Sequence, residues 1–74
     1  MQSEGAERIM THDEKLITIR AMDAYGGSFV KALARAWLLA DENNELRLEK
    51  AFPEYMEKYG PGGELFAAME KVLA

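Results

Sequence analysis

Apolar residues recur at helical spacing through the middle of the chain, from Tyr25 to Ala40. Two neighbouring stripes run along this stretch, one made of Phe29, Leu33, Trp37 and Ala40 and the other of Val30, Ala34 and Leu38. Because few charged residues interrupt them, a helix here needs neighbours around most of its circumference. The pattern predicts a buried central helix over residues 28–40, with Trp37 enclosed by the first, central and last helices.

A Gly26-Gly27-Ser28 turn precedes this central helix. Glycine accepts the left-handed backbone conformation that ends many helices, so we expect Gly26 or Gly27 to adopt a positive φ. The Ser28 hydroxyl is expected to cap the central helix. The sequence leaves open whether the turn binds an anion, since neither phosphate-loop glycine pattern is present.

Capping residues mark two further helices. Thr11 and Glu14 stand at capping-box spacing, which predicts a first helix that ends near residue 24. After the central helix, Asp41 or Asn43 is placed to cap a short third helix. A two-glycine connection favours side-by-side packing of the first and central helices.

Two more helical segments complete the chain. Pro53 cannot continue a helix but suits the first turn of a new one, so it marks a kink or a restart. Beyond the glycine-rich stop at residues 60–63, residues 64–74 have the clearest amphipathic pattern in the sequence. The apolar positions of this terminal helix are Leu65, Phe66, Met69, Val72 and Leu73.

These segments together predict the fold class. No stretch alternates apolar and polar residues as a half-buried strand does. We therefore expect an all-α fold, a small bundle of four to five short helices around a central helix at about residues 28–40. Residues 11–74 are expected to form a single helical domain, and residues 1–10 a flexible leader or a backward extension of the first helix.

Composition narrows the chemistry that such a bundle performs. The 74 residues include no Cys and one His, His12, so disulfides are excluded and no metal or cofactor site is predicted. His12 has no nucleophile or second catalytic group beside it, so no catalytic residue is assigned and the protein is not expected to be an enzyme. No membrane-spanning run or signal peptide is recognised, which indicates a cytoplasmic protein.

The charge distribution bears on the expected partners. A net charge of −4 argues against nucleic acid as the main partner. Lys31 and Arg35 form a candidate basic patch on the central helix, for which a solvated face is the simpler interpretation. The acidic residues of positions 41–57 leave an alternative open: a nucleic-acid-associated protein, or an acidic mimic of nucleic acid that inhibits a host DNA- or RNA-binding enzyme.

A partner protein is the expected source of additional stability. A chain of this length buries only about 60% of the surface that its unfolded form exposes. The candidate interface residues are Tyr55, Tyr59, Leu65, Phe66, Met69, Val72 and Leu73. The terminal helix either folds back on its own domain or docks on a second copy, and the second arrangement predicts a homodimer.

Part of the chain resembles a group of short bacterial and phage proteins. The shared pattern is Tyr25-Gly26-Gly27-Ser28-Phe29-Val30, Ala32-Leu33-Ala34, Ala36-Trp37 and Ala51-Phe52-Pro53-Glu54-Tyr55. The resemblance covers about residues 16–59; it implies a mobile-element setting and carries over no ligand or site residue. We therefore expect a phage- or prophage-type accessory protein that binds itself and an unidentified host or phage protein.

Overall fold

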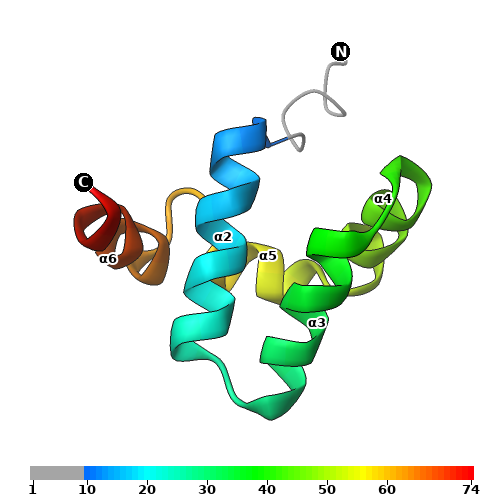
Figure 1. The fold of residues 1–74 in the computed structure, drawn as a ribbon, viewed down its shortest axis with the longest axis horizontal. Helices are drawn as coiled ribbons and strands as arrows, with labels where there is room; N and C mark the ends of the chain where they lie inside the picture. The colour runs from blue at the N-terminus through cyan, green and yellow to red at the C-terminus, as the bar shows by residue number, and fades with distance from the viewer. Residues whose placement is uncertain (1–9) are drawn as a thin grey trace.

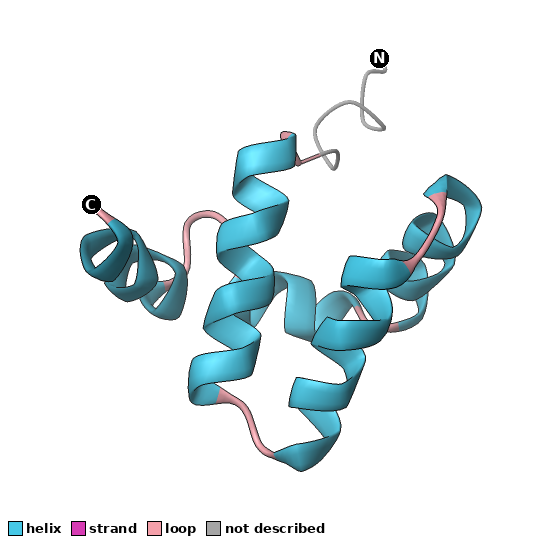
Figure 2. Cartoon of the chain, in the orientation of Figure 1, coloured by secondary structure: helices cyan, strands magenta, loops and turns pink. Residues whose placement is uncertain are grey.

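Five α-helices follow one another along residues 10–74, the part of the chain that the computed structural model describes, and no strand occurs there (Figures 1 and 2). The helices are α2 (His12–Tyr25), α3 (Ser28–Leu39), α4 (Glu42–Ala51), α5 (Pro53–Tyr59) and α6 (Glu64–Leu73). The all-α prediction is confirmed. The leader or helix extension expected over residues 1–10 lies, except for Met10, outside the described residues.

Helix α2, not α3, is the centre of the bundle. It packs against α3, α5 and α6, whereas α3 packs mainly against α2, with smaller contacts to α4 and, through the Phe29 ring, to Tyr55 of α5. Figure 1 shows α2 between α6 and α3, with α5 behind it. The helix predicted at residues 28–40 is present as α3, but the bundle is arranged around α2, because neighbours cover α3 on only part of its circumference.

The core is formed where these helices meet. Its buried apolar residues are Ile19, Ala21, Met22, Val30, Leu33, Ala34, Trp37, Tyr59, Phe66 and Met69. Trp37 is 0% exposed, which confirms its predicted burial. The buried Thr18 hydroxyl donates a hydrogen bond of 2.8 Å to the carbonyl of Glu14, so this polar group is satisfied inside the helix.

Only part of each predicted stripe on α3 is buried. The buried face consists of Val30, Leu33, Ala34 and Trp37, at the spacing of a single helical stripe. Phe29 is 56% exposed and Leu38 is 51% exposed, contrary to the prediction. Because α2 covers one side of α3, the buried stripe combines residues from the two predicted ones.

The turn between α2 and α3 differs from the prediction. Gly26 has a φ of −86° and Gly27 a φ of −83°, so neither glycine is left-handed. Gly27 occupies the N-cap position of α3, and Ser28 begins the helix without capping it. Gly26 is needed for close packing instead: a Cβ atom there would lie 2.4 Å from Val30 Cγ1 and 2.6 Å from the Met22 carbonyl oxygen.

The helices α2, α4 and α5 begin where the sequence predicted, near residues 11, 41 and 53. Thr11 and Glu14 form a capping box, with bonds of 3.1 Å to the Thr11 hydroxyl and 3.0 Å to the Glu14 carboxylate. The Asp41 carboxylate accepts a hydrogen bond of 2.9 Å from the Asn44 amide at the start of α4. Pro53 begins α5.

Helix α4 is only loosely packed against the rest of the bundle. It packs on α3 and α5, and no residue within it is fully buried in the described structure. Leu46 is 50% exposed. A Lys15–Glu45 ion pair joins α4 to α2.

Candidate protein-interaction surface

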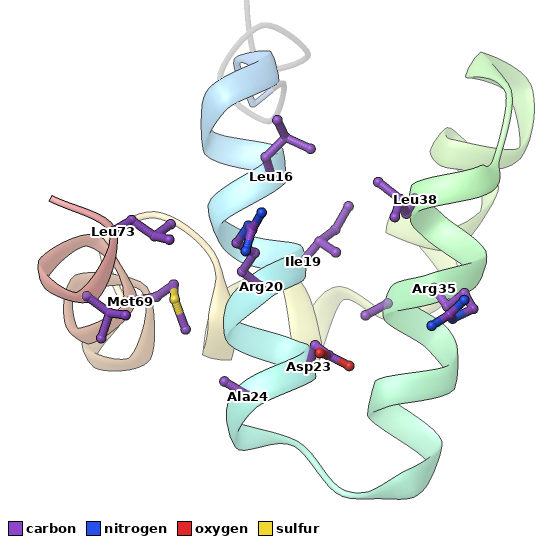
Figure 3. Close-up of a pocket in the computed structure, with 11 residues that line it drawn as sticks. Leu16, Ile19, Arg20, Asp23, Ala24, Arg35, Leu38, Met69 and Leu73 are labelled. Atoms are coloured by element: carbon purple, nitrogen blue, oxygen red, sulfur yellow. The ribbon is translucent and has the colours of Figure 1, made fainter.

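A surface groove of about 500 Å³ runs over α2 and reaches α3 on one side and α6 on the other. We call it the three-helix groove. Its lining residues are Leu16, Ile19, Arg20, Asp23 and Ala24 of α2, Ala34, Arg35 and Leu38 of α3, and Met69, Val72 and Leu73 of α6. Figure 3 shows the α2 residues in the middle, with those of α3 and α6 to either side.

The floor of the groove belongs to the core, but its rim does not. Ile19, Ala34 and Met69 are at most 6% exposed. On the rim, Leu38 is 51% exposed, Val72 is 68% exposed and Leu73 is 46% exposed. Exposed apolar side chains gathered around one concave surface are typical of binding sites, whereas scattered ones need no explanation.

Charged side chains of both signs accompany these apolar residues. Arg20 and Asp23 of α2 and Arg35 of α3 line the groove and are exposed. None of the three side chains forms an ion pair or hydrogen bond with another residue of the described range 10–74. Because the groove presents cations and a carboxylate together, it suits a partner that also carries both signs.

The predicted interface residues of α6 divide into two groups. Phe66 and Met69 are each 6% exposed, because α6 folds back on α2 and α5 of its own chain. Leu65 is partly buried against the same core. Val72 and Leu73 remain exposed at the groove. Of the predicted interface residues on α6, these two are the exposed ones.

The two predicted interface tyrosines lie in an aromatic row. Tyr59 is 3% exposed and belongs to the core, so its ring is not available as a surface contact. Tyr55 is partly buried, with its ring centroid 6.4 Å from that of Tyr59 and 6.2 Å from that of Phe29. Phe52 stacks on Tyr55 at 5.9 Å. The row joins the start of α3 to the α4–α5 junction, which gives these rings a structural role.

The predicted basic patch is divided between two environments. The Lys31 ammonium donates a hydrogen bond to the carbonyl oxygen of Asp23, near the end of α2. Arg35 lines the three-helix groove, where Arg20 joins it from α2. The structure thus ties Lys31 to a helix end and makes Arg35 part of the groove.

No three His, Cys, Asp or Glu side chains within residues 10–74 are grouped as metal ligands. None of the helices in this part of the chain has the length and hydropathy needed to cross a membrane. His12 lies beside a separate depression that Lys15, Glu42 and Glu45 also line, and the Lys15–Glu45 ion pair occupies part of it.

Sequence reasoning assigned no site role to Arg20, Asp23 or Leu38. A usable pattern was present, because Leu16, Ile19, Arg20 and Asp23 are spaced three, one and three residues apart and so share one face of α2. That face is apolar at one end and charged at the other, as an interaction surface often is. Leu38 could not be recognised in this way, because its exposure depends on which side of α3 is uncovered.

Comparisons with protein-family models, with curated proteins and with solved structures each found no match. The functional interpretation therefore depends on the surface of the chain itself.

Proposed function

We propose that the protein acts by protein–protein interaction and that a second copy of the chain docks in the three-helix groove to form a homodimer. The observation that supports this most strongly is the exposure of Leu38, Val72 and Leu73 around one concave surface. Burying a leucine or valine side chain contributes about 1.5–3 kcal/mol. Covering these residues in both copies would add substantially to the stability of a small domain.

A second copy suits this groove because of its mixed charge. A uniformly basic partner would be repelled by Arg20 and Arg35, and a uniformly acidic one would leave Asp23 without a cation. A copy of the same surface offers both signs and the same apolar rim. In a twofold dimer each such contact is made twice, so a small patch gives a larger interface.

The resemblance to short bacterial and phage proteins favours an accessory role in a phage or prophage, in which the dimer presents its remaining surface to a host or phage protein.

The acidic segment at residues 41–57 gives weaker support to the alternative function, a mimic of nucleic acid. Lys15 pairs with Glu45, and the Asp41 carboxylate caps α4, so part of its charge is already used within the chain. Salt-sensitive binding to duplex DNA, or displacement of DNA from a host enzyme, would favour the alternative instead.

Two leucines provide a matched test of the groove. Leu38 is 51% exposed on α3 within the groove, and Leu46 is 50% exposed on α4 outside it. We expect the apparent mass of the wild type to rise with concentration from 8.3 kDa toward twice that value in sedimentation equilibrium. Leu38→Glu should remain monomeric because it places a charge in the interface, while Leu46→Glu should dimerise as the wild type does.

Circular dichroism spectra establish that both variants keep their helices. A wild type that stays at 8.3 kDa at every concentration would contradict the proposed homodimer. Unchanged dimerisation of Leu38→Glu would show that the contact surface lies elsewhere.

A further inference from the structure

We propose that reciprocal ion pairs between Asp23 of each chain and Arg35 of the other set the register of the dimer, an inference that rests on the proposed function. Asp23 belongs to α2 and Arg35 to α3, and both line the three-helix groove. Both side chains are exposed, and neither is ion-paired with a residue that the structure describes. Two opposite charges on one surface are therefore available to a second copy of that surface.

The position of Asp23 on its own helix gives this carboxylate a reason to bind a cation. Asp23 lies in the last turn of α2, and this turn contains no basic residue. A negative charge there is unfavourable because the C-terminal end of a helix carries a partial negative charge. Lys31 reaches the backbone carbonyl of Asp23 and leaves the carboxylate unpaired. The carboxylate is therefore open to a guanidinium from a second chain, in addition to the Lys31 ammonium already at this helix end.

The arrangement of α2 and α3 allows both pairs to form at once. In Figure 3, Asp23 lies on the side of α2 that faces α3, and Arg35 lies on α3 at a similar level. A twofold axis along the gap between these helices places α2 of each copy opposite α3 of the other. Asp23 then meets the second chain's Arg35 on both sides of the axis, and Leu38, one turn from Arg35, lies near the axis.

Apolar and charged contacts have separate roles in this arrangement. The leucine and valine side chains of the rim supply most of the affinity, since exclusion of water does not depend on their register. The two charge pairs select one alignment, because shifting the chains would bring Arg20 or Arg35 opposite another arginine. Asp23 and Arg35 are thus the residues that determine specificity for a second copy.

Charge reversal provides a direct test. Asp23→Arg places an arginine opposite each Arg35 in a homodimer, and Arg35→Asp places an aspartate opposite each Asp23. Each variant alone should dimerise about tenfold or more weakly than the wild type, because like charges face each other twice. Mixing the two variants should restore dimerisation, since both contacts in the mixed dimer then join an arginine to an aspartate.

Native mass spectrometry separates the three possible dimers, because the two variants differ in mass. The doubly substituted chain, Asp23→Arg with Arg35→Asp, should form homodimers again with nearly the wild-type Kd. An Arg47→Asp variant serves as the matched control, because Arg47 is exposed on α4 outside the groove. It should dimerise normally with itself and should not rescue Asp23→Arg.

The possible outcomes distinguish this inference from the function on which it rests. If the single variants dimerise with wild-type affinity, the charge pairs are wrong and the homodimer remains. If they fail to dimerise and neither the mixture nor the double variant restores binding, direct contact between the two positions is also wrong. A monomeric wild type would overturn both proposals.

Discussion

Trp37 is the residue on which the core depends most, and its surroundings explain why. The side chain is fully buried, and its indole nitrogen has no hydrogen-bond partner within the described structure. An unpaired buried donor costs about 1–3 kcal/mol, so the stabilisation here comes from the volume of the ring and not from its polar atom. Size at this position therefore matters more than hydrogen bonding.

Two substitutions at Trp37 should separate these contributions. Trp37→Ala should lose about 3–5 kcal/mol, which is comparable with the whole stability expected of so small a domain. Trp37→Phe keeps part of the volume and removes the unpaired donor, so it should lose clearly less. Urea denaturation followed by circular dichroism measures both, and an Ala variant that unfolds cooperatively at nearly the wild-type midpoint would contradict this account.

Gly26 and Gly27 differ in the space around them despite their similar backbone angles. A Cβ atom at position 26 would collide with Val30 and with the Met22 carbonyl, whereas one at position 27 meets no described atom within 4 Å. Gly26→Ala should therefore destabilise the protein by about 1–3 kcal/mol through overpacking. Gly27→Ala should change stability little, because reduced freedom of the unfolded chain offsets the loss of a better N-cap residue.

Thermal unfolding of the two glycine variants provides the comparison. Equal destabilisation at both positions would point to a backbone requirement that the observed φ angles do not show.

Sequence reasoning recognised that a glycine was needed in this turn but gave the wrong cause. The conformation of a turn can be inferred from its residue types, whereas a collision with Val30 depends on the path that the chain takes afterwards.

At the scale of helices, the sequence predicted where a helix begins better than it predicted which face of the helix is buried. The Thr11 capping box, the Asp41 cap and the restart at Pro53 depend on residues within a few positions of one another, and all three are present. The buried face of α3 depends on which neighbour covers it. Phe29 and Leu38 were consequently assigned to the core although both are more than half exposed.

Helix α4 should be the least protected of the helices described. It contains no fully buried residue among those described, and a Lys15–Glu45 ion pair links it to α2. Segments with few buried contacts open most readily, so amides of α4 should exchange with deuterium faster than those of α2 and α3. Lys15→Ala should accelerate exchange in α4 further, while Lys71→Ala on α6 should leave it unchanged.

Amide exchange followed by NMR resolves each helix separately. Protection of α4 equal to that of α2, or the same response to both lysine substitutions, would show that α4 is stabilised by contacts other than the ion pair.

At the scale of the whole molecule, the sequence predicted the helical class and the helix that forms α3, but not that the bundle is arranged around α2. Composition showed that α3 is rich in apolar residues, yet it could not show that part of this surface stays exposed. Leu38, which belongs to that exposed part, forms the rim of the three-helix groove together with Val72 and Leu73 of α6. The apolar surface of α3 is thus divided between a buried face and an exposed one.

Only part of the candidate site could be recognised from the sequence. Val72, Leu73 and Arg35 were identified as interface or basic residues from their positions on single helices. Arg20 and Asp23 were not, because a site assembled from three helices becomes visible only when the packing of α2 against α3 and α6 is known. Phe66 and Met69 share the amphipathic pattern of Val72 and Leu73, but they are buried in their own chain.

The most direct test of the three-helix groove is an isotope-filtered NOE measurement on a mixture of methyl-labelled and unlabelled chains. It detects only contacts between different copies, so it locates the interface without any substitution. We expect intermolecular NOEs from the methyl groups of Leu38, Ile19 and Val72. Intermolecular NOEs from Leu39 and Leu46 in their place, in a sample shown by its mass to be dimeric, would contradict the proposal that a second copy docks in this groove.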